Sequence, residues 1–254
     1  MPLCKVKELT SCTTYQIRLL LPGILYLIPT ILADDTAAQV LPAQVDTHVA
    51  ALSYFLVENA RTARRFVKSV APAHVIEDLR FTVIDKDSSE AEIRAALKLV
   101  SAGQDAGILS EAGCPGVADP GAEIARVAHQ LGIRVVPLVG PSSLLLALMA
   151  SGLNGQSFAF HGYLPIEKAK RIAALKQLER AALTQHQTQL FIETPYRNMP
   201  LLDDLLAHLQ PTTRLCIAAS LTAPNEFVQT HTVGDWKGKL PEIHKQPAVF
   251  LLGK

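Results

Sequence analysis

The hydrophobic and polar pattern is clearest in the middle of the chain, where it predicts a capped helix. Ser89 and Glu92 stand three residues apart before an apolar-periodic stretch. This spacing is typical of a capping box, in which each residue satisfies a backbone N–H of the other, and it predicts a helix through Val100. Gly103 then suits the left-handed conformation that commonly follows a helix.

Two short apolar runs flank a second helix further along. Residues 106–110 and 133–138 each have the length and composition of a buried strand. Between them, Asp119 can cap a helix, Pro120 can occupy its first position, and Gly132 can end it. Helices and strands alternating at this spacing are typical of parallel α/β units with right-handed crossovers.

The same alternation returns in the second half, so the pattern predicts two α/β domains. The expected ranges are an N-terminal extension at 1–22, an N-terminal α/β domain at 23–138 and a C-terminal α/β domain at 139–254. The later expected elements are strands at 189–192, 214–218 and 247–252 and an amphipathic helix at 199–209.

The apolar stretch near the N-terminus resembles a secretory signal, because basic residues precede it and an alanine ends it. Pro22, Gly23 and Pro29 interrupt it, however, and the charged region before it is long. We therefore expect a buried first strand at 24–28. No other apolar run approaches the roughly 18 residues that a membrane span requires.

Composition narrows the class of protein. The formal net charge is only +1, whereas proteins that bind chiefly nucleic acid carry a basic excess, so any contact with RNA must rest on a local patch. The four cysteines form no C-x-x-C pair and the histidines no H-x-x-x-H pair. These features favour a reducing, cytoplasmic location and argue against a metal site.

The loop at 110–121 is the first candidate for chemistry. It follows an expected strand, at the edge of a parallel sheet where ligands bind, and its three glycines allow close backbone approach. The chain has no G-x-G-x-x-G, and Ala122-Glu123 stands where a phosphate-binding Walker loop needs Lys-Ser/Thr. The alternative is an ordinary structural turn.

Three further segments are candidates. Residues 140–143 open an apolar helix with two serine hydroxyls that suit a carboxylate or a ribose, unless they only cap the helix. Residues 192–197 combine an acid, an aromatic and a base at a strand end, or form a simple turn with a solvated ion pair. Residues 58–68 predict a basic helix that could hold phosphates, or a solvated helix face.

In their order along the chain, these segments resemble the tetrapyrrole methylase superfamily of S-adenosylmethionine-dependent methyltransferases. The likeness is greatest to the branch that 2′-O-methylates a cytidine of small-subunit ribosomal RNA. Seven segments carry it, at 25–30, 58–61, 110–115 with 119–121, 136–143, 150–153, 158–165 and 193–197.

The resemblance implies two α/β domains with S-adenosylmethionine in the cleft between them, and a homodimer. The residues that it places at the cofactor are Pro29, Glu111, Ala112, Gly113, Cys114, Val117, Ser142, Ser143, Glu193, Thr194 and Leu221. A hydroxyl acceptor benefits from a positioned base, and the candidates are Glu58, Glu111 and Glu193. The candidates for substrate binding are Arg61, Arg64, Arg65, Tyr196 and Arg197, and Lys168, Lys170 and Arg171 offer further phosphate contacts.

The chain departs from the ribosomal branch at three charged or turn-forming motifs. Residues 31–35 replace a Gly-Asn turn, Glu58-Asn59-Ala60-Arg61 replaces Glu-Asp-Thr-Arg, and residues 219–223 replace an Arg-Glu-Leu-Thr-Lys run. These changes leave three functions open: an RNA methyltransferase, a methyltransferase for a tetrapyrrole or another small metabolite, and a non-catalytic S-adenosylmethionine-binding module.

Overall fold

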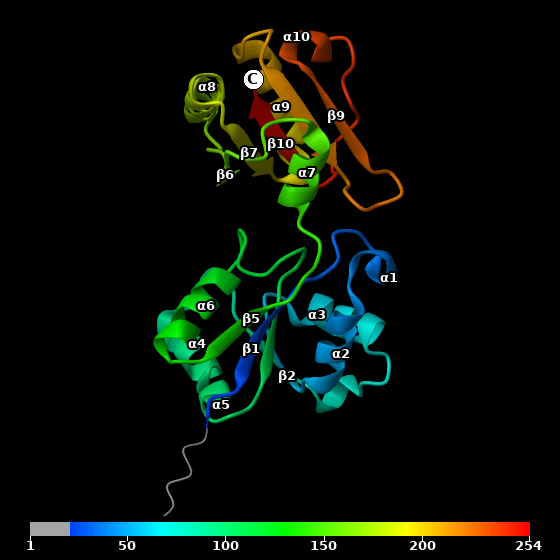
Figure 1. The fold of residues 1–254 in the computed structure, drawn as a ribbon, viewed down its shortest axis with the longest axis vertical. Helices are drawn as coiled ribbons and strands as arrows, with labels where there is room; N and C mark the ends of the chain where they lie inside the picture. The colour runs from blue at the N-terminus through cyan, green and yellow to red at the C-terminus, as the bar shows by residue number, and fades with distance from the viewer. Residues whose placement is uncertain (1–20) are drawn as a thin grey trace, which may run out of the picture.

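The computed structural model describes residues 21–254; the predicted N-terminal extension at 1–22 lies almost entirely outside the described residues. Two five-stranded sheets organise the chain (Figure 1). The strands of the first, in the order β3-β2-β4-β1-β5, are β1 (Ile24–Ile28), β2 (Tyr54–Val57), β3 (Arg80–Val83), β4 (Ala106–Leu109) and β5 (Arg134–Pro137). Every pairing in this sheet is parallel.

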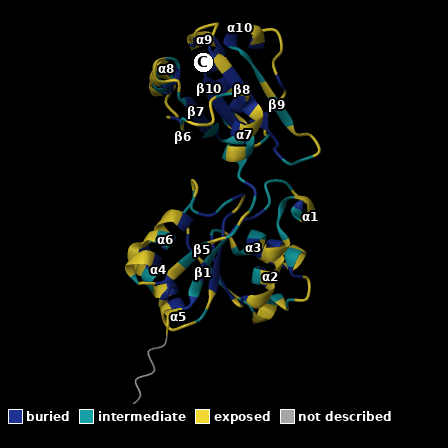
Figure 2. Cartoon of the chain, in the orientation of Figure 1, coloured by how far each residue is buried: buried dark blue, intermediate teal, exposed yellow. Residues whose placement is uncertain are grey.

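Helices cover both faces of the first sheet. They are α1 (Ala37–Val40), α2 (Ala43–Ala51), α3 (Ala60–Val70), α4 (Glu90–Ala96), α5 (Lys98–Ser101) and α6 (Gly121–Gln130), with a 3-10 turn η1 (Ile76–Asp78). One core cluster packs α4 and α6 against the sheet, and another packs α2 and α3 against its opposite face. Every residue of the central strands β2 and β4 is buried, the edge strands β3 and β5 are partly exposed, and the outer faces of the helices are exposed (Figure 2).

The second sheet is mixed. Its strands, in the order β6-β7-β10-β8-β9, are β6 (Phe158–Tyr163), β7 (Thr188–Glu193), β8 (Arg214–Ala219), β9 (Phe227–Thr232) and β10 (Ala248–Gly253). Only β6 and β7 pair in parallel; β10 runs antiparallel between β7 and β8, and β8 pairs antiparallel with β9. The short connection from β8 to β9 explains that last pairing, because a parallel pair needs a long crossover.

The helices of the second half pack on both faces of this sheet. They are α7 (Ser143–Ser151), α8 (Lys168–Gln185), α9 (Asn198–His208) and α10 (Val233–Trp236), with a 3-10 turn η2 (Pro195–Arg197). One core cluster contains residues of α8, α9 and α10, and the other contains α7. The predicted domain boundary at 138/139 falls in the connection from β5 to α7, which passes from one sheet to the other (Figure 1).

Local sequence signals explain where several elements begin. The capping box is confirmed: the Ser89 N–H donates to Oε2 of Glu92 at 2.7 Å, and the Glu92 N–H donates to Ser89 Oγ. The helix predicted through Val100 is broken at Leu97 into α4 and α5. The helix predicted from Pro120 begins one residue later, with Pro120 as its N-terminal neighbour. No helix in the described part of the chain is long and apolar enough to span a membrane.

Candidate functional site

The carboxyl ends of the parallel strands meet at one edge of the first sheet. In register, Leu109 of β4 stands between Ile28 of β1 and Val57 of β2, and Pro137 of β5 pairs with Leu27 of β1. The segments that leave these strands therefore start side by side. This is the edge at which open parallel sheets bind ligands.

Hydrogen bonds between these segments hold them together. The Thr30 N–H donates to the Gly113 carbonyl at 2.9 Å, which joins the loop after β1 to the loop after β4. The Cys114 thiol donates to the Pro141 carbonyl at 3.3 Å, which joins the loop after β4 to the segment before α7. Gly140 packs on Pro29 so closely that a Cβ at Gly140 would lie 2.2 Å from Pro29 Cγ.

The loop after β4 has a conformation that depends on glycine. Gly113 and Gly116 have φ values of 77° and 87°, in the left-handed region that disfavours residues with a Cβ. Oδ1 of Asp119 accepts hydrogen bonds from the N–H groups of Gly116 and Gly121, both at 2.7 Å. Asp119 therefore fixes the loop as well as the start of α6.

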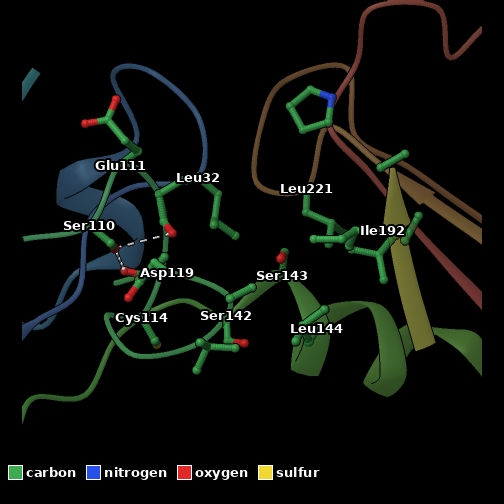
Figure 3. Close-up of a pocket in the computed structure, with 18 of the residues that line it drawn as sticks. Leu32, Ser110, Glu111, Cys114, Asp119, Ser142, Ser143, Leu144, Ile192 and Leu221 are labelled. Atoms are coloured by element: carbon green, nitrogen blue, oxygen red, sulfur yellow. Dashed lines mark hydrogen bonds between the residues drawn. The ribbon is translucent and has the colours of Figure 1, made fainter. Parts of the chain in front are cut away.

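The start of α7 offers polar groups to the same edge. Ser142 is the N-cap residue of α7, and its side chain makes no capping hydrogen bond. Ordinary capping, the alternative reading of this segment, is therefore not how the Ser142 hydroxyl is used. Ser142 and Ser143 both face the space between the two sheets (Figure 3).

Strand ends of the second sheet form the opposite wall. Ala248, the first residue of β10, pairs with Glu193 at the end of β7 and with Ala219 at the end of β8. Leu221 follows β8 and faces Leu32 across the gap (Figure 3). Ser220, beside Leu221, has a φ of 49°, and strained residues of this kind concentrate at binding sites.

Together the two walls enclose a cleft of about 380 Å³, within the size range of small-molecule sites. Among the described residues that line it, four carry carboxylates and none is lysine, arginine or histidine; the four are Glu58, Glu111, Asp119 and Glu193. The field in this cleft therefore favours a ligand with positive charge and disfavours a phosphorylated one.

Burial and like charges set the protonation of these groups. The pKa of Glu58 is raised, mainly by burial and further by the negative charges of Asp119 and Glu111. Burial also raises the pKa of Asp119, although the two N–H donors oppose the shift. Burial and the charge of Asp119 raise the pKa of the Cys114 thiol, which suits its role as a hydrogen-bond donor.

Glu193 is the most deeply buried acid of the cleft, with 4% of its surface exposed. Its Oε1 accepts hydrogen bonds from the Thr194 N–H at 2.7 Å and from Arg197 Nε at 3.0 Å. Its Oε2 is buried and has no hydrogen-bond partner within residues 21–254. Since buried polar atoms are nearly always paired, this oxygen is available to a donor on a ligand.

Most of the predicted cofactor residues meet in the cleft. Those that line it are Glu111, Ala112, Gly113, Cys114, Val117, Ser142, Ser143, Glu193 and Leu221. Pro29 and Thr194 do not line it: Pro29 packs behind it on Gly140, and Thr194 bonds to Glu193. All three candidate bases, Glu58, Glu111 and Glu193, border the cleft.

The predicted substrate residues lie outside the cleft. The Arg64 guanidinium stacks over the ring of Phe81, 5.5 Å from its centroid, and Arg197 is paired with Glu193. Tyr196 is exposed, with Lys245 over its ring. Arg61 and Arg65 are exposed on α3 and have no ion-pair partner in the described structure.

Several lining residues were not predicted to bind a ligand. They include Leu32, Ala118, Leu144, Phe160, Tyr163, Ser220 and residues 247–249, where β10 begins at Ala248. Phe160 and Tyr163 lie in the segment at 158–165 that carries part of the family resemblance, and this resemblance could have identified them as ligand-binding residues. The start of β10 reaches the cleft because it runs antiparallel between β7 and β8, which an apolar terminal run does not reveal.

A family model described as Tetrapyrrole (Corrin/Porphyrin) Methylases matches residues 31–236. The chain belongs to this family. It is 30% identical to the ribosomal RNA small subunit methyltransferase I of Escherichia coli O157:H7 over 84% of this chain and 70% of that protein. The protein of the same name from Vibrio cholerae is also 30% identical, over 81% of this chain and 67% of the relative.

Solved structures share the fold. The methyltransferase CobJ aligns with a TM-score of 0.60 at 18% identity, over 91% of this chain and 94% of its own. Uroporphyrin-III C-methyltransferase from Thermus thermophilus, solved with S-adenosylhomocysteine, aligns with a TM-score of 0.56 at 19% identity, over 91% and 98% of the two chains. The predicted two-domain α/β fold is confirmed, as is the assignment to a family of S-adenosylmethionine-dependent methyltransferases.

Proposed function

We propose that this protein transfers a methyl group from S-adenosylmethionine to a nucleotide of small-subunit ribosomal RNA. The relatives named as small-subunit methyltransferases cover most of the chain and support that acceptor. The resemblance of the sequence to the cytidine 2′-O-methylating branch favours a ribose hydroxyl as the methylated group.

The charge of the cleft is the observation that carries the cofactor assignment. S-adenosylmethionine has a sulfonium and an ammonium group, and the carboxylates of Glu58, Glu111 and Asp119, which have no ion-pair partner in the described structure, suit both cations. Oε2 of Glu193, which no group of residues 21–254 contacts by a hydrogen bond, can accept one from an amino or hydroxyl group. The hydroxyls of Ser142 and Ser143, with the N–H groups at the start of α7, suit a carboxylate or the ribose.

When bound, S-adenosylmethionine supplies an electrophilic methyl carbon, so the protein's part is mainly to align the acceptor. A carboxylate that accepts the acceptor's proton assists the transfer. Of the three candidates, Glu193 is committed to Arg197, whereas Glu58 and Glu111 lie on the first-sheet side of the cleft. We propose that the base is one of these two.

Contact with RNA rests on a local basic surface. On α3, Arg61 and Arg65 are exposed and available to phosphates, whereas the Lys68 ammonium donates to two backbone carbonyls. The basic residues at the start of α8, Lys168, Lys170 and Arg171, contribute less to RNA binding. Arg171 is buried in an ion pair with Asp204, and Lys170 pairs with Glu167. We therefore expect α3 to make the main phosphate contacts and binding to weaken with salt.

We also propose that the protein works as a cytoplasmic homodimer. The family resemblance is the main support for a dimer. The apolar side chains of Leu145 and Met149 on α7 are exposed, 51% and 78% respectively, and a second subunit would cover them. The reducing environment that the cysteine pattern favours supports the location.

The function is tested by methyl transfer from labelled S-adenosylmethionine to small ribosomal subunits. The subunits come from an Escherichia coli strain without its small-subunit methyltransferase I, and nuclease digestion with mass spectrometry locates the label. We expect label in one RNA nucleotide. Label in a low-molecular-weight fraction of an extract instead would indicate a metabolite methyltransferase. Cofactor binding with no transfer to any fraction would indicate a binding module.

A further inference from the structure

A second cavity, of about 400 Å³, adjoins the cofactor cleft on the side of the first sheet. The segment after β1, helix α1 and helix α3 surround it. It shares two lining residues with the cleft, Ser110 and Glu111. A group bound in this cavity would therefore have access to the cofactor at the Glu111 end.

Glu111 is turned toward this second cavity. Its Oε1 accepts a hydrogen bond from the Thr62 hydroxyl of α3 at 2.6 Å. Figure 3 shows the carboxylate directed away from the wall that carries Leu221 and Ile192. Glu58 and Glu193 line the cleft but not the second cavity, so Glu111 alone of the three candidate bases borders both spaces.

The lining of the second cavity has the chemistry of a nucleoside site. Carboxylates of Asp34, Asp35 and Glu111 can accept hydrogen bonds from ribose hydroxyls and exocyclic amines. Ile31 and Phe66 supply apolar surface for a flat ring. With three acids and one base in its lining, the cavity disfavours phosphate inside it. The one base, Arg65, is exposed and can bind a phosphate at the mouth.

We propose that the second cavity receives the acceptor nucleoside, turned out of its RNA strand, and that Glu111 meets its hydroxyl. This inference rests on the proposed function and names the place and class of the acceptor. A cavity of this size admits one nucleoside but no duplex, so the nucleotide must leave its stack. As the acceptor oxygen bonds to the methyl carbon, the carbon–sulfur bond breaks with its electron pair remaining on sulfur. The hydroxyl proton passes to the Glu111 carboxylate.

Blocking the cavity tests where the acceptor binds. Ala37 of α1 lines the cavity, whereas its neighbour Ala38 is exposed and does not, so Ala37→Trp and Ala38→Trp form a matched pair. Cytidine is titrated by calorimetry into each protein saturated with S-adenosylhomocysteine. We expect wild type and Ala38→Trp to bind cytidine and Ala37→Trp to bind it at least about tenfold more weakly, with S-adenosylhomocysteine affinity unchanged throughout. No cytidine binding to wild type, or equal binding to both variants, would overturn the proposal.

Replacing Glu111 tests its role separately. Glu111→Gln keeps the shape and can still accept the Thr62 hydrogen bond. With S-adenosylmethionine and RNA both saturating, we expect the transfer rate to fall by about 10²–10⁴-fold, more than any loss of affinity for cytidine or S-adenosylhomocysteine. A saturated rate equal to that of wild type would remove Glu111 as the base. Cytidine binding with no methylation of RNA by wild type would overturn the proposed function but leave the cavity assignment standing.

Discussion

Arg197 donates two hydrogen bonds to a single oxygen of Glu193, at 3.0 and 2.5 Å, and the other carboxylate oxygen has no partner within the described part of the chain. The Glu193 side chain is 1% exposed, and Arg197, whose side chain is 30% exposed, is its one ion-pair partner among residues 21–254. The pair stands where β7 ends at the cleft. A change to this ion pair should therefore affect both the stability of the fold and the ligand site.

We expect Arg197→Met to be strongly destabilising. The substitution leaves the buried Glu193 carboxylate without a cation, and loss of one partner of a buried pair costs about 3–5 kcal/mol. The free energy of unfolding, measured by urea denaturation, should fall by that order.

Two further variants isolate the cause. Adding Glu193→Gln to Arg197→Met should recover much of the loss, because the uncompensated charge is gone. Lys170→Met removes an exposed ion pair with Glu167 and should change stability by less than about 1 kcal/mol. If Arg197→Met proves as mild as Lys170→Met, the charge of Glu193 does not depend on Arg197.

Filling the cleft should abolish cofactor binding without unfolding the protein. Val117 lines the cleft and is 47% exposed, so an indole can be accommodated there without backbone strain, but it would occupy ligand space. We expect Val117→Trp to weaken S-adenosylmethionine binding by at least about tenfold in calorimetry. Gly113 is a poorer probe, because its φ of 77° makes any side chain strained.

Val139 provides the matched control for the cleft. It is an exposed valine, at 68%, in the nearby connection before α7, and it does not line the cleft. Val139→Trp should bind S-adenosylmethionine as wild type does. Equal affinity of wild type and Val117→Trp would place the cofactor elsewhere.

Gly140→Ala should disturb the contact between the segment that leads to α7 and Pro29, which follows β1. The new Cβ would lie 2.2 Å from Pro29 Cγ, a distance that requires the backbone or the proline ring to move. Overpacking of this kind costs about 1–3 kcal/mol, and thermal unfolding should show a lower Tm. Gly155→Ala, where an added Cβ would meet no atom of residues 21–254 within 4 Å, should leave the Tm nearly unchanged. Similar Tm values for the two variants would show that the contact with Pro29 is readily relieved.

Three strands of the first sheet, β1, β4 and β5, could be predicted from the sequence because their signals are local, whereas β2 and β3 were not predicted. A capping box at Ser89 and Glu92 and short apolar runs between turn residues mark helices and buried strands directly. The loop at 110–121 was identified as a ligand loop for the same reason, since it follows one of those strands.

The second sheet was less predictable because its order depends on contacts between distant residues. Nothing local to residues 248–253 shows that β10 inserts antiparallel between β7 and β8 and brings Ala248 to the cleft. An ion pair within 192–197 was one of the two interpretations of that segment, but it was expected to be solvated, and the burial of Glu193 is not visible in the sequence alone. The second cavity also depends on how α1 and α3 pack.

The raised pKa of Glu58 predicts a pH dependence of stability. Burial, with the charges of Asp119 and Glu111, raises this pKa above its ordinary value of 4.5, so folding favours the protonated carboxyl. The resulting stabilisation is present below the ordinary pKa and is lost as pH rises through the raised one. Glu58→Gln keeps an uncharged acceptor for the Glu111 N–H, which reaches Glu58 Oε1 at 3.4 Å. Its Tm should therefore match that of wild type in acid and exceed it at neutral pH.

Glu77→Gln, at an exposed position, is the control, and its Tm should follow the wild-type curve of Tm against pH throughout. If Glu58→Gln also follows that curve, the carboxylate is solvated well enough to ionise at no cost to folding, and Glu58 would then be a competent proton acceptor at neutral pH alongside Glu111.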